Sequence, residues 1–171
     1  NRTVCEIGCG TGRCLAALRE AGFSKLIGIE NSRHRAEAAK RNYDLSVLTS
    51  SFEHPESISR LEKEAPLSLI YSHHVLEHTY NPAEIISSAS RIQKSGDWFI
   101  NSLPNFYGEP SLTVLFFLPH LHSFSSEFFG SLLRRYNYEI FDNSLTTDAE
   151  IYVVARKTDK TIKQHLDDRD R

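Results

Sequence analysis

Short hydrophobic runs alternate with longer amphipathic stretches along most of the chain. Five runs of strand length predict β-strands at residues 3–7, 25–30, 45–48, 67–72 and 97–103. Four stretches with helical spacing lie between them, near residues 13–21, 33–42, 56–64 and 82–92. Strands that alternate with helices are typical of an α/β fold, in which helices cover both faces of a mostly parallel sheet.

The pattern changes after residue 103. Residues 104–124 form a long connection rich in aromatic residues and histidine, and loops of this length are usually functional or disordered. A helix is predicted at 126–136, followed by an antiparallel hairpin of strands 138–142 and 149–156, with its turn at Asp142, Asn143 and Ser144. Residues 158–171 are dominated by charged side chains, and we expect a disordered tail there.

Composition narrows the possible functions. The chain has 171 residues, of which 40% are hydrophobic, and a formal net charge of −2, which fits one compact domain with its own core. Because no basic excess or basic run is present, we expect no nucleic-acid partner. The longest apolar run, residues 112–118, is far shorter than the roughly 20 residues that span a bilayer, so we expect no membrane span.

The first residues carry two further signals. Cys5, Cys9 and Cys14 match neither a C-x-x-C redox pair nor paired zinc knuckles, so we expect reduced thiols in a cytoplasmic protein. The chain contains no methionine, and its first strand begins within a few residues of Asn1. We therefore expect that a segment of a longer protein precedes it.

The strongest motif is the sequence E-I-G-C-G-T-G at residues 6–12, which joins a strand to a helix. Glycine allows a sharp turn and a close approach of backbone to a ligand, and the N-terminus of the following helix offers free N–H groups. Glu30 ends the second strand, where a carboxylate can accept hydrogen bonds from ribose hydroxyls. Together these features indicate a cofactor that contains a nucleoside.

The identity of that cofactor depends on the spacing. Dinucleotide sites usually have G-x-G-x-x-G, whereas here an acidic residue precedes three glycines at alternate positions, which suits a ligand with an ammonium group. The sequence resembles the class I S-adenosylmethionine-dependent methyltransferases in this motif. The resemblance continues through Glu30, residues 69–78 with Pro82, residues 103–105 and residues 120–125. An NAD-dependent oxidoreductase is the less favoured alternative, because the glycine spacing does not fit.

The resemblance implies a Rossmann-like, doubly wound, mostly parallel seven-stranded sheet with a C-terminal antiparallel hairpin and helices on both faces. It implies a methyltransferase domain over residues 1–157 that lacks its N-terminal helical segment, with S-adenosylmethionine as cofactor. The cofactor residues that it implies, from the methionyl end to the adenine, are Glu6, Gly8, Cys9, Gly10, Gly12, His73, Glu30, Asn31, Ser51 and Phe52. Residues 93–97 replace the usual Pro-Gly-Gly of the family, and we expect only a surface turn to be affected.

Residues 74–78 read H-V-L-E-H and allow more than one interpretation. The pattern H-x-x-E-H also occurs in inverted zinc proteases, where both histidines lie on one helix, but that interpretation leaves the glycine motif unexplained. The ubiquinone-pathway O-methyltransferases, which this region resembles, carry E-x-x-E-H here, and some bind a divalent cation through it. His74 replaces the first carboxylate, so a metal at Glu77 and His78 is a weak prediction. The favoured interpretation is that both residues support the cofactor loop through hydrogen bonds.

Methyl transfer to a hydroxyl group benefits from a general base, and histidine titrates near neutrality. His74 is the first candidate and His122, in the aromatic connection, the second. The resemblance implies a small-molecule acceptor, with a hydroxyl of a sugar, lipid or quinone-like compound as the leading class. The alternative of a different kind is a non-catalytic, methyltransferase-like binding module within a larger protein. The sequence does not determine the oligomeric state.

Overall fold

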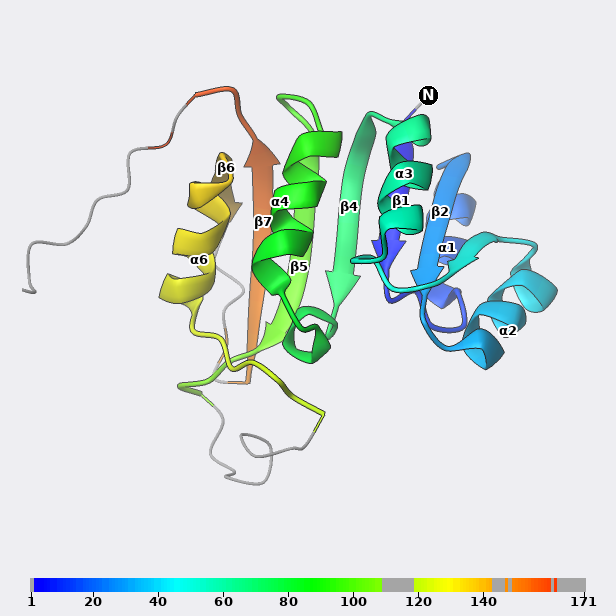
Figure 1. Ribbon diagram of the computed structural model, residues 1–171, viewed down its shortest axis with the longest axis horizontal. Helices are drawn as coiled ribbons and strands as arrows, with labels where there is room; N and C mark the ends of the chain where they lie inside the picture. Colours follow the sequence, from blue (N-terminus) through cyan, green and yellow to red (C-terminus); the bar gives the residue numbers. More distant parts are fainter. Residues whose placement is uncertain (1, 109–118, 143–146, 148, 161, 163–171) are drawn as a thin grey trace, which may run out of the picture.

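The computed structural model describes residues 2–108, 119–142, 147, 149–160 and 162. Within these residues, seven strands form one sheet in the order β3-β2-β1-β4-β5-β7-β6 (Figure 1). The first five strands run parallel, and β7 lies antiparallel between β5 and β6. The order runs outward in both directions from β1 and β4, so the predicted doubly wound sheet and its C-terminal antiparallel pair are confirmed.

The elements begin and end within one residue of the predicted positions. The strands are β1 (Thr3–Ile7), β2 (Lys25–Glu30), β3 (Ser46–Thr49), β4 (Leu67–His73), β5 (Trp98–Pro104), β6 (Tyr138–Asp142) and β7 (Glu150–Lys157). The helices are α1 (Arg13–Glu20), α2 (Arg33–Tyr43), α3 (Pro55–Glu64), α4 (Pro82–Ile92) and α6 (Ser126–Arg135), with a short 3₁₀ turn, η1, at Leu76–His78. The predicted hairpin turn at Asn143 and Ser144 and most of the predicted tail lie outside the described residues.

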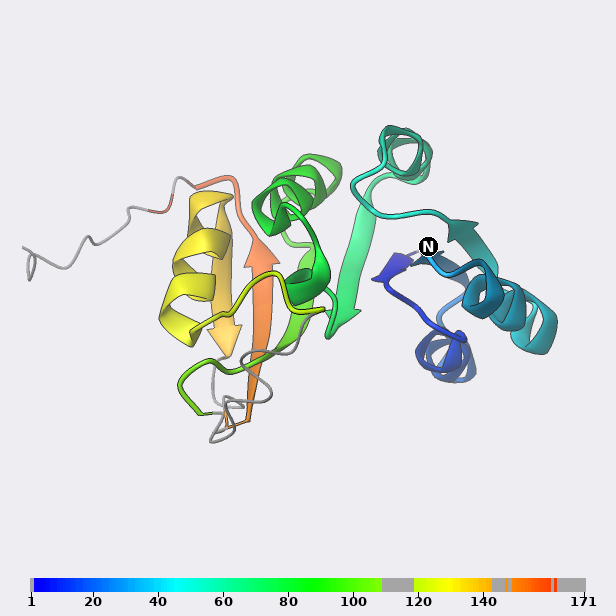
Figure 2. The ribbon, with the colours of Figure 1, turned by 60° about the horizontal axis from the view of Figure 1, so that its bottom comes forward.

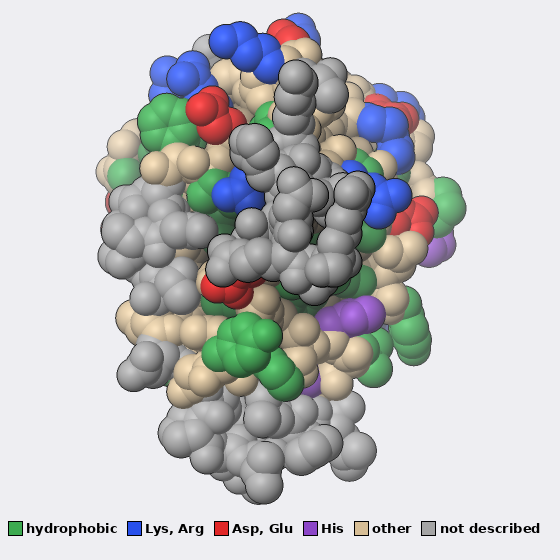
Figure 3. Space-filling view, turned by 90° about the vertical axis from the view of Figure 1, so that its left-hand side faces the viewer, with side chains coloured by type: hydrophobic (Ala, Val, Ile, Leu, Met, Phe, Trp, Pro, Cys, Tyr) green, Lys and Arg blue, Asp and Glu red, His purple; other side chains and the backbone are tan. Residues whose placement is uncertain are grey.

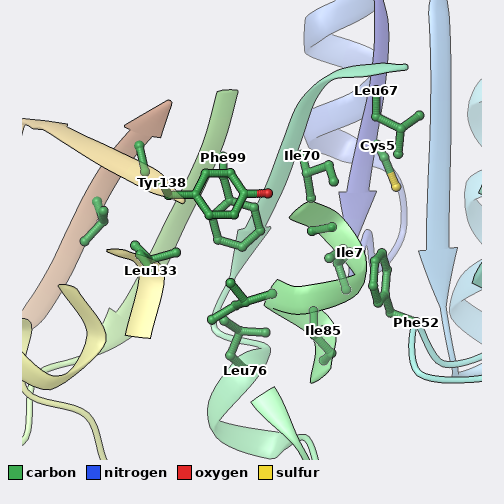
Figure 4. Close-up of a cluster of buried hydrophobic side chains, with 14 of the residues drawn as sticks. Cys5, Ile7, Phe52, Leu67, Ile70, Leu76, Ile85, Phe99, Leu133 and Tyr138 are labelled. Atoms are coloured by element: carbon green, nitrogen blue, oxygen red, sulfur yellow. The ribbon is translucent and has the colours of Figure 1, made fainter. Parts of the chain in front are cut away.

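Helices cover both faces of the sheet and bury two separate clusters of apolar side chains. On one face, α3, α4 and α6 lie over a core that includes Ile70, Phe99 and Leu133 (Figures 1 and 4). On the other face, α1 and α2 cover a smaller cluster that includes Leu15 and Ala39 (Figure 2). With both faces covered, the edge at the carboxyl ends of the parallel strands is the place where this architecture binds ligands.

Local sequence explains where the helices start. Asn81 accepts a hydrogen bond from the Glu84 N–H through its side chain, and Pro82 occupies the first position of α4, where a missing N–H costs nothing. Ser32 caps α2 and Ser125 caps α6 in the same way. These caps fix the chain direction as it leaves the edge that carries the candidate site.

Gln93 departs from the expectation of a surface turn. Only 5% of the residue is exposed, and its side-chain amide donates hydrogen bonds to the carbonyls of Leu67, at 3.0 Å, and Trp98, at 2.7 Å. The expectation holds for the exposed Lys94 and Ser95 and was wrong for Gln93, because its side chain turns inward and donates to carbonyls of both β4 and β5.

No helix in the described part of the chain combines the length and the apolar composition of a membrane span. Viewed from the β6 edge, acidic side chains are interspersed with the lysine and arginine side chains (Figure 3).

Candidate cofactor site

The glycine turn after β1 is fixed to the end of β2. The N–H groups of Gly8 and Cys9 both donate to the carbonyl of Ile29, at 2.8 and 3.0 Å. Gly8 has a φ of +71°, and a Cβ added there would lie 2.4 Å from Cγ2 of Val75, so only glycine allows this close approach. Gly10, at φ +55°, has no described heavy atom within 4 Å of where its Cβ would stand, so its surface is open.

The carboxylate of Glu30 connects this turn to the start of α2. One oxygen accepts a hydrogen bond from the Gly10 N–H at 2.9 Å, and the other accepts from the Ser32 N–H at 2.8 Å. Each carboxylate oxygen has two acceptor positions, so both retain capacity for a ribose hydroxyl. Glu30 is therefore held in place by two backbone donors, and its contact with a ribose stays a prediction.

Glu6 lies beneath the turn and is nearly enclosed. Only 6% of the residue is exposed, and its Oε2 atom has no hydrogen-bond partner among the described residues. Burial raises the pKa of this carboxyl to about 7, the charge of Glu30 adds to the rise, and a hydrogen bond with Cys14 opposes it. A buried acceptor without a partner is costly, and a ligand ammonium group would remove that cost.

A cavity of about 450 Å³ opens at the carboxyl ends of β1, β2 and β4. Eight of the predicted site residues line it, namely Gly8, Glu30, Asn31, Ser51, Phe52, His73, His74 and His78. Gly8, after β1, and the two histidines at the end of β4 are far apart in the sequence and thus meet at one site. The fit to S-adenosylmethionine rests on this lining, on the open surface of Gly10 and on the unpartnered oxygen of Glu6.

Other predicted cofactor residues lie around the cavity rather than in its wall. Cys9 is 5% exposed, and its side chain belongs to the cluster under α1 and α2, so only its backbone belongs to the turn. Gly12 is buried, and a Cβ there would lie 2.5 Å from Leu45. Phe52 reaches the wall, but at 3% exposure its ring packs mainly in the core, which leaves little free face for stacking on adenine.

Sequence reasoning missed several lining residues, among them three with large polar or aromatic side chains. Arg35 comes from the first turn of α2, and Glu53 and Tyr80 come from the connections after β3 and η1. Tyr80 is 87% exposed, which is unusual for a large aromatic side chain. Arg35 could have been predicted, because it lies in the first turn of the helix that follows Glu30. Nothing in the sequence around Tyr80 marked that residue as part of a site.

His73 and His74 lie side by side at the end of β4, with ring centroids 4.4 Å apart. His74 has a φ of +51°, and both of its ring nitrogens face carboxylates. Nε2 lies 2.9 Å from Oε1 of Glu150 on β7, and Nδ1 lies 3.4 Å from Oε1 of Glu77. The pKa of the Glu150 carboxyl is lowered, first by its hydrogen bond with the Tyr152 hydroxyl and then by His74.

The turn that follows does not fit the zinc-protease alternative and shows how Glu77 and His78 are held. Because residues 76–78 form a 3₁₀ turn and His74 precedes it, the two histidines do not share a helix as in an inverted zinc protease. The Glu77 side chain is 1% exposed, and neither carboxylate oxygen has a hydrogen-bond partner among the described residues. Hydrogen bonds are made instead by the backbone carbonyl of Glu77, which accepts from the N–H groups of Leu121 and His122, and by the ring of His78, which bonds to the carbonyl of Pro119 at 2.9 Å. Support of the cofactor loop by Glu77 and His78 stays a prediction.

His122, the second candidate base, does not line the cavity. Its Nε2 atom lies 3.3 Å from the carbonyl of Tyr80, and its backbone N–H donates to the carbonyl of Glu77 at 3.1 Å. The connection after β5 thus returns to the site, but His122 contacts backbone carbonyls there and not the cavity. Its assignment as a base stays a prediction.

Comparisons with known proteins agree with this geometry. The sequence model of the methyltransferase domain family matches residues 1–143. A curated relative, the mitochondrial ubiquinone biosynthesis O-methyltransferase of Dictyostelium discoideum, is 26% identical over 110 aligned residues, which cover 54% of this chain and 32% of the relative. The chain thus spans about a third of the length of that relative.

Solved structures share the fold at low sequence identity. One is the complex of the Haloferax volcanii Trm112 methyltransferase activator with a methyltransferase, with a TM-score of 0.74, 17% identity, and coverage of 91% of this chain and 81% of that chain. Another is the magnesium protoporphyrin IX methyltransferase of Synechocystis PCC 6803 with bound S-adenosylhomocysteine, with a TM-score of 0.71, 16% identity, and coverage of 92% and 75%.

The glycine turn, the cavity at the carboxyl ends of the parallel strands and the family match over residues 1–143 lead to one conclusion. The chain belongs to the methyltransferase domain family, and it is a class I S-adenosylmethionine-dependent methyltransferase domain.

Proposed function

We propose that this chain transfers the methyl group of S-adenosylmethionine to a hydroxyl group of a small-molecule acceptor. The observation that carries the proposal is one cavity in which Glu30, on the cofactor side, meets His73 and His74. The similarity to a relative named for ubiquinone biosynthesis O-methylation supports a phenolic hydroxyl as the acceptor group.

The residues around the cavity divide into those that hold the cofactor and those that face the acceptor. Glu30 would accept from the ribose hydroxyls, and Asn31 and Ser51 would flank the adenosine. Glu6 lies beneath the glycine turn and outside the lining of the cavity, and its unpartnered oxygen would receive the methionyl ammonium group. S-adenosylmethionine, when bound, supplies a methyl group on a positively charged sulfur. The protein must then hold the acceptor oxygen in line, exclude water and take up one proton.

We assign His73 as the base that takes up the proton of the acceptor hydroxyl. Its ring lines the cavity and is exposed, and no described residue hydrogen-bonds to its ring nitrogens. Burial and the neighbouring His74 lower the pKa of His73, so its imidazole is neutral at pH 7 and can accept a proton. His74, held between Glu77 and Glu150, would position His73, and its own assignment as base remains a prediction to be tested alongside.

Turnover with a panel of phenols, catechols and sugar alcohols tests the proposal. The assay would measure S-adenosylhomocysteine and the methylated product. His73→Ala should lower kcat by about a hundredfold and change the Kd for S-adenosylmethionine far less, although the family resemblance implies a cofactor contact at this position. His34→Ala, an exposed histidine on α2, is the matched control and should leave both values unchanged.

Three outcomes would each contradict a part of the proposal. Equal loss of kcat in His74→Ala with none in His73→Ala would move the base to His74. Tight binding of S-adenosylmethionine with no product from any acceptor class would favour the non-catalytic binding module instead. A melting shift with NAD but none with S-adenosylmethionine would also overturn the assignment of the donor.

A further inference from the structure

We propose that Tyr80 is a cofactor-binding residue whose ring stacks on the adenine of S-adenosylmethionine and covers it from solvent. Tyr80 lines the cofactor cavity together with Ser51 and Phe52, the residues at which the resemblance places adenine. Its side chain reaches this cavity from the connection between η1 and α4. The inference concerns the cofactor alone and does not depend on which acceptor the protein methylates.

The burial of Phe52 leaves the stacking position without an aromatic face. Phe52 is 3% exposed and packs in the core under α3 and α4, so its ring has little surface to offer to a ligand. Apart from the histidines, the aromatic residues among the described ones that line the cavity are Phe52 and Tyr80. The flat face of a base stacks well on an aromatic ring, and Tyr80 is the residue that can supply one.

The backbone on both sides of the Tyr80 ring is held in place. The N–H of Asn81 donates to Oε1 of Glu53 at 3.0 Å, which brings Tyr80 next to residues 51–53. The carbonyl of Tyr80 lies 3.3 Å from Nε2 of His122. Asn81 also caps α4 through its side chain. A ring that projects from a fixed backbone loses little further freedom when a ligand binds, which favours affinity.

The exposure of Tyr80 points to a missing contact. The residue is 87% exposed, although a tyrosine ring gains free energy when its apolar surface leaves water. A bound adenine would cover the ring and would itself be covered by it. Tyr107 is a useful contrast, because it is also largely exposed, at 77%, but lies outside the cavity lining and contacts the ring of Phe106 instead.

Calorimetric titration with S-adenosylhomocysteine tests the stacking contact without any acceptor. We expect Tyr80→Ala to weaken binding by about tenfold or more, because stacking on an aromatic side chain makes a large contribution for each base. Tyr80→Phe should bind like the unaltered protein, since the contact uses the face of the ring and not the hydroxyl. Tyr107→Ala is the matched control and should also keep the affinity of the unaltered protein.

Hydroxyl-radical labelling, read by mass spectrometry of peptides, shows directly whether the ring is covered. Saturating S-adenosylhomocysteine should cause a loss of labelling at Tyr80 and leave the labelling of Tyr107 unchanged, so Tyr107 is the internal control in the same sample. Because neither experiment contains an acceptor, the proposed methyl transfer to hydroxyl groups can fail while both of these results hold.

Three results would overturn the assignment of Tyr80. One is equal affinity for S-adenosylhomocysteine in Tyr80→Ala and in the unaltered protein. Another is a loss of affinity in Tyr80→Phe as large as that in Tyr80→Ala, which would assign the contact to the hydroxyl and not to the ring. The third is labelling of Tyr80 that is the same with and without S-adenosylhomocysteine.

Discussion

The hydroxyl of Tyr138 donates a 2.6 Å hydrogen bond to the side-chain carbonyl of Gln93, and both residues are buried. Through this contact and the two bonds donated by its amide, Gln93 links β4, β5 and β6 across the core (Figure 4 shows the ring of Tyr138). The side chain uses its acceptor and its amide donors, so it stabilises the sheet on which the cofactor edge is built.

Gln93→Ala should therefore destabilise the protein by about 3 kcal/mol, because it leaves a buried hydroxyl and two carbonyls without partners. Urea unfolding followed by circular dichroism measures the change. Lys94→Ala, at the exposed neighbouring position, should stay within about 0.5 kcal/mol of the unaltered protein. A loss at Gln93 no larger than that of Lys94→Ala would show that these hydrogen bonds contribute little.

Gly10→Ala tests whether the open turn faces the cofactor. A side chain at φ +55° costs roughly 1 to 2 kcal/mol of stability, and the new Cβ would project into the open space above the turn. We expect the affinity for S-adenosylmethionine to fall at least about tenfold, measured by calorimetry. Gly22→Ala is matched, because Gly22 also has a positive φ, +96°, and open space but lies after α1, away from the cavity. Gly22→Ala should lose stability and keep its affinity for S-adenosylmethionine. Equal affinities in the Gly10→Ala and Gly22→Ala variants would exclude the glycine turn from the cofactor site.

Glu6 should make the stability of the ligand-free protein depend on pH. Its folded pKa of about 7 lies above the ordinary value of 4.5, so the folded state holds the proton more tightly than the unfolded chain. The contribution of Glu6 to stability is then fully present below about pH 4.5 and is lost as pH rises through 7, by up to about 3 kcal/mol at about 1.4 kcal/mol per pKa unit.

Glu6→Gln should remove most of this pH dependence. Free energies of unfolding at several values between about pH 5 and pH 8 would show it, with the exposed Glu62→Gln variant as control. Parallel curves for Glu6→Gln and the unaltered protein would contradict the raised pKa.

Glu150→Gln tests the positioning of the two histidines. The substitution keeps the shape of the side chain and removes the charge that faces Nε2 of His74 at 2.9 Å. We expect kcat to fall about tenfold with the Kd for S-adenosylmethionine unchanged, because Glu150 acts on the acceptor side. The exposed Glu139→Gln variant on β6 is the control. A change in cofactor affinity without a change in kcat would show that Glu150 acts on the cofactor and not on the acceptor.

Local patterns in the sequence were sufficient for the elements, for the sheet class and for the half of the site built near the first strands. Hydrophobic periodicity identifies strands and helices, and the glycine turn at residues 8–12 is specified by glycines that adopt positive φ. Glu30 could be placed beside that turn because consecutive parallel strands end at the same edge of a sheet.

The remaining contacts were decided by tertiary structure alone. His74 meets Glu150 across 76 positions, Gln93 meets Tyr138 across 45, and Glu77 holds the segment that carries His120. Such pairs depend on the β5-β7-β6 order and on the path of a long connection, neither of which leaves a periodic signal in the chain. The sequence by itself therefore determined the cofactor turn, whereas the packing of distant segments decided which polar side chains are buried together and what they can bind.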